Sequence, residues 1–226
     1  MGVRGGVRRV SATLAGVALA AVSESACGIA PESVDSTGPT REDARSATAD
    51  AVVPPARDGS DRVGVPAPPF TVAGWIGSSP LSLADLRGKV VLVRFFTDEC
   101  PYCRATAPAL KQLDEDFRAR GLVVVGLFHP KPRGSKRPTA RVEAVVDGWG
   151  WRFPVGLDGD WTTLDAYWLA SGDRSATSAS FLVDQRGVIR WVHPGPEFHP
   201  DGPADHEACR RDYAELRAAI EALLDE

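Results

Sequence analysis

The sequence has few cysteines for its length, four in 226 residues, so it is not a disulfide-dense scaffold. It also lacks an excess of basic residues. The net charge of −4 argues against a general nucleic-acid-binding protein. No internal repeat is visible. Hydrophobic residues make up 43% and charged residues 25%, a balance typical of a soluble globular protein with one ordinary domain and an extension.

The N-terminus differs from the rest of the chain. Arg4, Arg8 and Arg9 precede an uncharged apolar run at residues 11–22. This pattern is typical of an export signal, and the run is shorter than the ~20 residues of a membrane-spanning helix. We therefore predict a signal or anchor segment at residues 1–26 and a periplasmic or cell-envelope location. An unprocessed cytoplasmic extension is the alternative.

Cys27 follows small residues, as the lipid-bearing cysteine of a lipoprotein does, although Glu24 stands where such signals carry an aliphatic residue. A lipid there would tether the protein to a membrane. Residues 27–62 are rich in Pro, Ser, Thr, Asp, Ala and Gly and have no aromatic residue. Such a segment cannot bury a core, so we predict a disordered linker that leads to a domain at residues 63–226.

Hydrophobic patterns divide that domain into strands and helices. The near-continuous apolar runs at 89–96 and 122–128 predict strands buried on both faces. Further strands are expected at 153–158 and on either side of a turn at 185–187, and helices at 101–120, 139–149, 162–170 and 205–224. This order predicts an α/β fold in which helices flank a central mixed sheet.

The stretch "DECPYCRA" places Cys100 and Cys103 at the start of a predicted helix. Residues three apart on a helix are neighbours, which brings the two sulfurs within disulfide reach. Pro101 suits the first turn, and the free N–H groups there favour a Cys100 thiolate. Cys100 is thus the predicted nucleophile and Cys103 the resolving thiol of a redox pair.

Two other uses of the pair remain open, a static structural disulfide and a structural zinc site. Zinc usually takes four ligands, and the sequence has no second CxxC. His206 and Cys209 form an H-x-x-C pair, but Cys209 lies on the apolar stripe of its helix, where we expect a buried, inert thiol.

Several motifs occur here in the order seen in thioredoxin-like redoxins: "GVPAPPF", "LSLADLRGKVVLVRFFTDECPYC", "FPVGLD" and "SFLVDQRGVIRWV". From about Val63 onward the chain resembles the exported TlpA-type thiol–disulfide oxidoreductases and the alkyl-hydroperoxide-reductase (AhpC/TSA) group. The resemblance implies a thioredoxin-like fold. It also implies that Pro108 is the proline of the active-site helix.

The chain departs from that family at three positions. Ser178 stands where the family has a cis-proline facing the cysteines, and Thr177 and Ser178 would form the loop that aligns the substrate chain. A trans peptide is expected before Ser178. Arg94 replaces a buried acid. It either lowers the thiol pKa or reaches solvent or an acid such as Asp98 or Glu99. Thr97, three residues before Cys100, partly matches a peroxidatic motif.

The four histidines are expected to be loop residues without a special role. The stretch at 193–206, rich in His, Pro and Gly, is alternatively a loop beside the active site. A copper-binding protein of this fold would use the two cysteines with one distant histidine, His193 being the candidate. Five tryptophans are expected in core and rim packing, namely Trp149, Trp151, Trp161, Trp168 and Trp191.

We therefore expect a thiol–disulfide oxidoreductase that acts outside the cytoplasm through Cys100 and Cys103 and needs no bound cofactor or metal. Arg94 and Pro101 tune the thiol pKa. The expected partners are protein or small-molecule disulfides and a redox partner protein, with no nucleic acid. The alternatives are a thiol peroxidase that uses the same cysteines and a non-catalytic metal carrier with Cys100, Cys103 and His193 as ligands.

Overall fold

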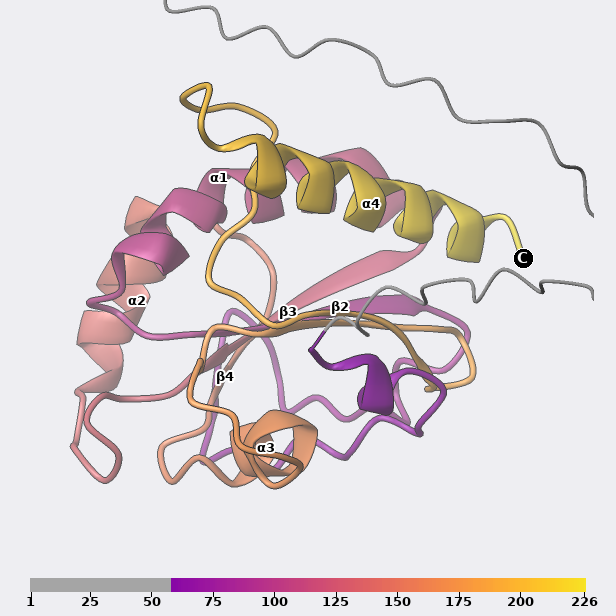
Figure 1. Ribbon diagram of the computed structural model, residues 1–226. Coiled ribbons are helices and arrows are strands. Elements are labelled where there is room, and N and C mark those ends of the chain that lie inside the picture. Colours follow the sequence, from indigo (N-terminus) through magenta and orange to yellow (C-terminus); the bar gives the residue numbers. More distant parts are fainter. Residues whose placement is uncertain (1–57) are drawn as a thin grey trace, which may run out of the picture. The chain divides into compact units, whose positions relative to one another are not determined.

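The computed structural model describes residues 58–226, and a six-stranded sheet forms their centre (Figure 1). The strands are β1 (Trp75–Ile76), β2 (Val90–Phe96), β3 (Leu122–Phe128), β4 (Val155–Leu157), β5 (Ser180–Val183) and β6 (Ile189–His193). Their order across the sheet is β1-β4-β3-β2-β5-β6. The pairs β2–β3 and β3–β4 are parallel and the others antiparallel, which confirms the mixed sheet.

Helices cover both faces of this sheet. They are α1 (Pro101–Phe117), α2 (Thr139–Gly148), α3 (Thr162–Leu164), which continues as a π-helical turn (Asp165–Leu169), and α4 (Glu207–Leu224), with 3₁₀ turns at Ser60–Arg62 and Arg118–Arg120. Figure 1 shows α1 and α4 on one face and α3 on the other. Each face has its own hydrophobic core, which explains why the central strands are apolar on both sides.

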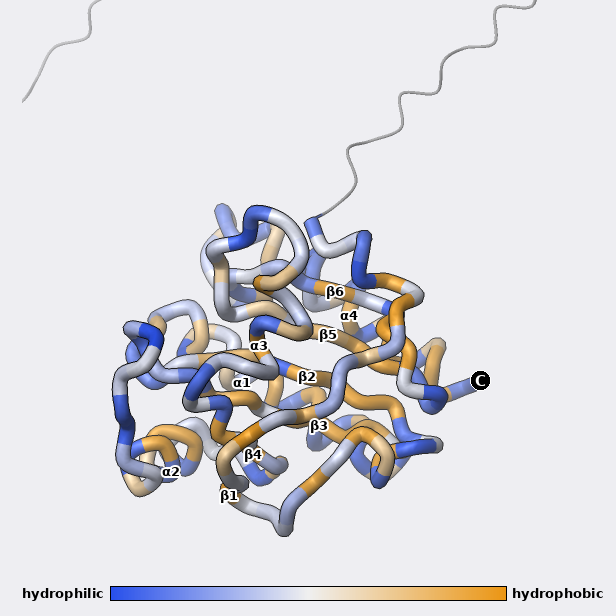
Figure 2. The backbone as a smooth tube through the Cα atoms, turned by 90° about the horizontal axis from the view of Figure 1, so that it is seen from below, coloured by the Kyte–Doolittle hydropathy of each residue, from blue (hydrophilic) through white to orange (hydrophobic). Residues whose placement is uncertain are grey.

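The alternation of β2 decides where Arg94 points. Leu92 and Phe96 belong to the core that α1 and α4 cover, whereas Val93 and Phe95 belong to the opposite core. Successive side chains of a strand face opposite ways, so Arg94 shares the α1 face with Leu92 and Phe96. Figure 2 shows the hydrophobic stretches of β2 and β5 around this position. Arg94 is thus a cation inside an apolar layer, directly below the helix that begins with the cysteines.

Most predicted elements are present, with three differences. The segment at 162–170 is one α-helical turn followed by a π-helical one, and the Asp158 carboxylate caps its start by accepting the N–H groups of Thr163 at 3.0 Å and Leu164 at 2.8 Å. The last helix begins at Glu207, two residues later than predicted. The two-residue strand β1 was not predicted, since it depends on pairing with the distant β4.

The first described residues already pack on the domain. Asp58 and Asp61 bind Arg174, and Gly59, at φ +93°, lies so close to Val192 that a Cβ atom would be 2.6 Å from its Cγ1. The predicted linker therefore ends earlier than residue 62. The predicted signal segment at 1–26, Cys27 and the linker up to residue 57 lie outside the described residues. From residue 58 onward, no helix combines the length and the apolar character that crossing a membrane requires.

Candidate active site

Cys100 caps the N-terminus of α1, and Pro101 is the first residue of the helix. The backbone N–H of Cys103 points at Cys100 Sγ, with a distance of 3.4 Å between nitrogen and sulfur. Both thiols are free; Cys103 is buried with 2% of its surface exposed, whereas Cys100 is half-buried. The geometry therefore separates the two sulfurs into one that a substrate can reach and one that it cannot.

The surroundings favour a negative charge on Cys100 and oppose one on Cys103. The hydrogen bond from the Cys103 thiol, the N–H groups of Cys103 and Tyr102, and the charge of Arg94 together lower the pKa of Cys100 to about 5, against the effect of burial. The hydrogen bond to Cys100, together with burial, raises the pKa of Cys103. At neutral pH the exposed sulfur is a thiolate and the buried one a thiol.

Arg94 is fully buried beside this pair. Its Nη1 donates to Ser180 Oγ at 3.1 Å and its Nη2 to the Pro196 carbonyl at 2.9 Å, while the guanidinium lies 5.6 Å from the centre of the Phe198 ring. Burial lowers the pKa of Arg94, and the charges of Cys103 and Cys100 oppose that shift. A buried cation that interacts with both sulfurs favours their ionised forms.

The structure contradicts the two alternatives for Arg94, namely a side chain that reaches solvent and one that pairs with Asp98 or Glu99. The side chain does not reach solvent, and the two acids considered as partners bind other residues. Asp98 accepts from Arg141 Nε at 2.7 Å and from Arg137 Nε at 3.3 Å, and Glu99 accepts from Arg141 Nη2 at 2.7 Å. Among residues 58–226 Arg94 therefore forms no ion pair with a carboxylate, although the charge of Glu197, beyond ion-pair contact, acts on it together with the two sulfurs.

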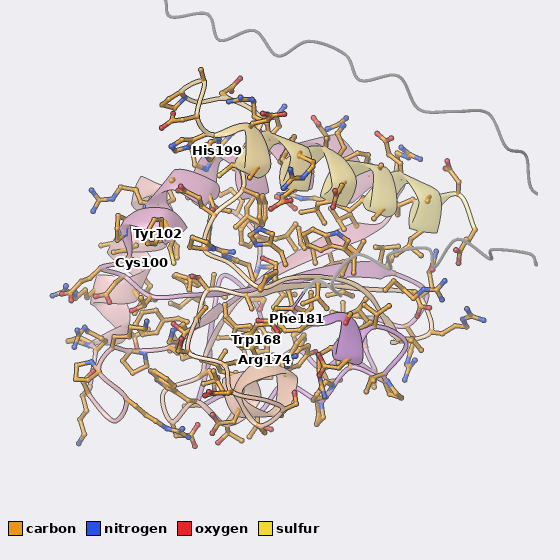
Figure 3. All side chains as sticks on the ribbon, in the orientation of Figure 1. Cys100, Tyr102, Trp168, Arg174, Phe181 and His199 are labelled. Carbon is orange, nitrogen blue, oxygen red and sulfur yellow. The ribbon has the colours of Figure 1, made fainter. Side chains whose placement is uncertain are left out.

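A cavity of about 430 Å³ opens beside Cys100. It is lined by Thr97, Glu99, Cys100, Pro101, Tyr102, Lys131, Ala176, Thr177, Ser178 and Pro196. Figure 3 shows Cys100 and Tyr102 together at the start of α1. Tyr102 is 48% exposed, which is unusual for a large aromatic residue and leaves its ring free to contact a substrate. The predicted loop residues Thr177 and Ser178 thus lie in the same cavity as the reactive sulfur.

Several lining residues were not predicted for the site, among them Lys131 and Pro196. Lys131 follows the carboxyl end of β3, which meets the carboxyl end of β2 at one edge of the sheet, so its place could have been inferred from the parallel pairing. Pro196 belongs to the His- and Pro-rich stretch, which was considered as a loop beside the active site. Of the described peptide bonds only Lys131–Pro132 and Gly195–Pro196 are cis, so the predicted trans bond before Ser178 is confirmed.

Two of the four histidines are buried rather than in exposed loops. His129 follows β3, and burial, with the charges of Lys131 and Arg94, lowers its pKa to about 3. His193 ends β6; its Nδ1 accepts the N–H of Gly195 at 3.2 Å, and its Nε2 lies 3.2 Å from Asp212 Oδ2. Both nitrogens of His193 are therefore occupied within its own region.

The ligand set of the alternative metal carrier, Cys100, Cys103 and His193, does not form. Among residues 58–226 these three are not gathered into a group with ligand spacing. The tryptophans behave as predicted: Trp151 and Trp168 are buried at 3% and 0% exposure, and the other three are partly buried. Cys209 differs from the prediction, since it is half-buried rather than buried.

The ionisation of Cys100 gives a direct prediction. Its alkylation by iodoacetamide, followed by peptide mass spectrometry, should rise with pH through a midpoint near 5 and be level at pH 7, because only the thiolate reacts. The same peptide in denatured protein is the control, with a midpoint near the ordinary value of about 8.5. A folded-state midpoint at 8 or above would show that the helix start and Arg94 do not stabilise the thiolate.

Comparisons with known proteins agree with this geometry. The model of the AhpC/TSA family matches residues 63–192. Protein DipZ of Mycobacterium tuberculosis is 28% identical over 131 residues, which cover 55% of this chain and 17% of DipZ. The thiol-disulfide oxidoreductase ResA of Halalkalibacterium halodurans is 28% identical over 134 residues, covering 59% of this chain and 69% of ResA. The chain therefore spans about a sixth of DipZ and over two thirds of ResA.

Solved structures confirm the fold. A thiol:disulfide interchange protein of the thioredoxin family from Chlorobium tepidum superposes with a TM-score of 0.53 at 24% identity, covering 70% of this chain and 95% of that protein. The thioredoxin-like fold expected from the motifs is thus confirmed, with the cysteine pair at the start of the first long helix, after the central strand β2.

Proposed function

The chain belongs to the AhpC/TSA family, and we propose that it is a thiol–disulfide oxidoreductase in which Cys100 attacks and Cys103 resolves. One observation carries the proposal. The accessible sulfur lies at the N-terminus of α1, where its pKa is lowered, while its partner three residues on is buried and protonated. The two similar proteins, the thiol-disulfide oxidoreductase ResA and the thiol:disulfide interchange protein of Chlorobium tepidum, support the same enzyme class.

In the reducing direction, the Cys100 thiolate forms a bond to one sulfur of a substrate disulfide and breaks the substrate S–S bond. The leaving thiolate takes a proton from solvent. Cys103 then loses its proton and attacks Cys100 Sγ, which forms the intramolecular disulfide and releases the second substrate thiol. Two electrons pass from the pair to the substrate, and an external dithiol returns them. The reverse sequence oxidises a substrate dithiol.

The second step requires a change in the pKa of Cys103. While Cys100 is a thiolate, its hydrogen bond holds the Cys103 proton. Once Cys100 is part of a mixed disulfide its negative charge is gone, and the charge of Arg94 acts on Cys103 alone. A nearby cation lowers the pKa of a thiol, so formation of the mixed disulfide itself prepares Cys103 to attack.

The substrate is a protein or small-molecule disulfide that enters the cavity beside Cys100. Thr177 and Ser178 form one wall, with 6% and 8% of their surface exposed, and the exposed ring of Tyr102 stands at the opening. We infer that an extended peptide would lie along this wall. A redox partner protein would use the same cavity to return the cysteine pair to its starting redox state. We place this exchange outside the cytoplasm because residues 1–26 have the pattern of an export signal.

A thiol peroxidase is the competing function, since Thr97 lies three residues before Cys100. However, the Thr97 hydroxyl donates to Asp98 Oδ1 at 3.3 Å, which directs it toward an ion-paired carboxylate rather than toward a bound peroxide. Asp98 is in turn buried and fixed by Arg141. This arrangement supports disulfide exchange over peroxide reduction.

A competition experiment tests the proposed function. The reduced protein is mixed in a stopped-flow instrument with a model disulfide or with hydrogen peroxide, and oxidation of the pair is followed. We expect disulfide exchange at least about tenfold faster, because it needs only the thiolate and its resolving partner. A peroxide rate constant far above that for the disulfide would make the peroxidase the better assignment.

A further inference from the structure

The loop between β6 and α4, together with the first turn of α4, gathers four side chains that the redox mechanism does not use. Glu197, His199, His206 and Cys209 each offer one ligand atom, and these atoms all lie within 4.8 Å of one another. All four residues are half-buried. Figure 3 shows His199 in this loop, apart from Cys100 at the start of α1. We propose that these four residues form a zinc-binding site.

The distances come close to those of a tetrahedral site. Zinc bonds of about 2.0–2.3 Å place neighbouring ligand atoms roughly 3.3–3.8 Å apart. His199 Nε2 lies 3.0 Å from His206 Nδ1, and His206 Nδ1 lies 4.0 Å from Glu197 Oε1. All four donor atoms lie within 4.8 Å of one another, so the two measured pairs bracket the ligand spacing and the other pairs exceed it by at most about 1–1.5 Å.

The ring of His199 is oriented for metal binding by its other nitrogen. Its Nδ1 contacts the backbone carbonyl of Asp201, an acceptor, so Nδ1 carries the proton and Nε2 presents its lone pair to the cluster. Metal-binding histidines are typically fixed in this way. Gly202, at φ +122°, lets the loop close over the ring, because a Cβ atom there would lie 2.7 Å from His199 Cε1.

The loop is also fastened to α4 on both sides of the cluster. The N–H of His199 donates to the Cys209 carbonyl at 3.4 Å, and Arg210 donates to the carbonyls of Pro203 at 2.7 Å and Ala204 at 3.0 Å. These contacts hold ligands from the loop and from the helix in one place before a metal arrives. Preorganisation of this kind lowers the free energy needed to order the site.

The donor set selects the metal. One thiolate, two imidazoles and one carboxylate match Zn²⁺, whereas Ca²⁺ and Mg²⁺ prefer oxygen ligands alone and Cu⁺ prefers thiolate and thioether. The charges of Cys209 and Glu197 neutralise the cation. Four protein ligands leave no open position, which is the pattern of a structural rather than a catalytic zinc site.

Zinc at this site would hold in place the loop residues that contact Arg94 beside the cysteine pair. Glu197 directly follows Pro196, whose carbonyl accepts from Arg94 and whose ring lines the cavity beside Cys100. Phe198, between two of the ligands, packs below the Arg94 guanidinium, and its N–H donates to Thr106 Oγ1 of α1 at 3.4 Å. A metal that joins the loop to α4 therefore fixes both contacts of Arg94 with this loop.

The test uses the full chain with Cys27, Cys100 and Cys103 replaced by Ser, so that Cys209 is its one thiol. The reduced, chelator-treated protein is titrated with Zn²⁺ by calorimetry and with Co²⁺ as a spectroscopic probe. We expect one ion per chain, a sulfur-to-cobalt charge-transfer band, and a melting temperature that rises with Zn²⁺. Absence of stoichiometric binding would overturn the proposal.

Further variants separate ligation from general electrostatics. Cys209→Ser and His199→Ala should each weaken Zn²⁺ binding at least about 100-fold, and Cys209→Ser should abolish the charge-transfer band. Glu197→Gln should weaken binding, whereas Glu207→Gln, the same charge change at an exposed position on α4, should leave it unchanged. Circular dichroism of each variant verifies folding. Equal affinity in the Cys209→Ser and parent proteins would also refute the site.

Discussion

Replacement of Cys100 by Ser is expected to abolish disulfide exchange, whereas replacement of Cys103 by Ser should trap substrates on the enzyme. Cys100 is the accessible thiolate, and without it no bond to the substrate sulfur forms. In Cys103→Ser the first step still occurs, but no buried thiol is present to release the product. The expected losses are at least about 1,000-fold in turnover for both variants, with opposite effects on covalent capture.

Non-reducing gels and intact-mass measurements of the two variants distinguish these outcomes. Mixed disulfides should accumulate with Cys103→Ser and be absent with Cys100→Ser. Equal trapping by both cysteine variants, or by neither, would contradict the division of roles.

The parts of the fold that were predicted correctly depend on local patterns. The runs of β2 and β3 are apolar apart from Arg94, because both faces of the central sheet are covered, and β3 has the predicted bounds. The π-helical turn at Asp165–Leu169 was predicted only as helix. The start of this segment is fixed by the buried Asp158 carboxylate, which caps the preceding turn from the end of β4, a contact that local periodicity does not report.

In the active site, too, local sequence patterns were predictive and contacts between distant residues were not. The spacing of Cys100 and Cys103 made the redox pair visible in the sequence, since both residues lie on one helical turn. The partners of Arg94 were not visible, because Ser180 and Pro196 are 86 and 102 residues away. The placement of His199 beside His206 likewise depends on the turn at Gly202. The pattern of hydrophobic residues gives no indication of this turn.

The positive charge of Arg94 favours the thiolate of Cys100, whereas an acid at the same position would disfavour it. In the oxidised protein the disulfide is neutral, the buried guanidinium donates only to neutral acceptors, and among the nearby groups only Glu197 supplies an opposite charge. In the reduced protein, the Cys100 thiolate supplies a counter-charge. The cation therefore stabilises the reduced form relative to the disulfide, and a pair that is more stable when reduced is a stronger oxidant.

Substitution of Arg94 by Met should therefore raise the pKa of Cys100 by about 1 unit, because the thiolate loses a buried cation. Both proteins keep Cys100 ionised at pH 7, so the change of about 1.4 kcal/mol lowers the reduction potential of the pair by about 30 mV. Thiolate absorbance against pH and equilibration with glutathione measure the two quantities. Arg94→Lys should restore most of both.

Arg104→Met is the matched control for that substitution. Arg104 follows Cys103 on α1 but is exposed, so its charge is screened by solvent and its loss should leave the pKa and the potential nearly unchanged. If Arg94→Met and Arg104→Met behaved alike, the buried position of Arg94 would have no special influence on the cysteines. A rise in potential in Arg94→Met would mean that Arg94 stabilises the disulfide instead, contrary to its contacts in the structure.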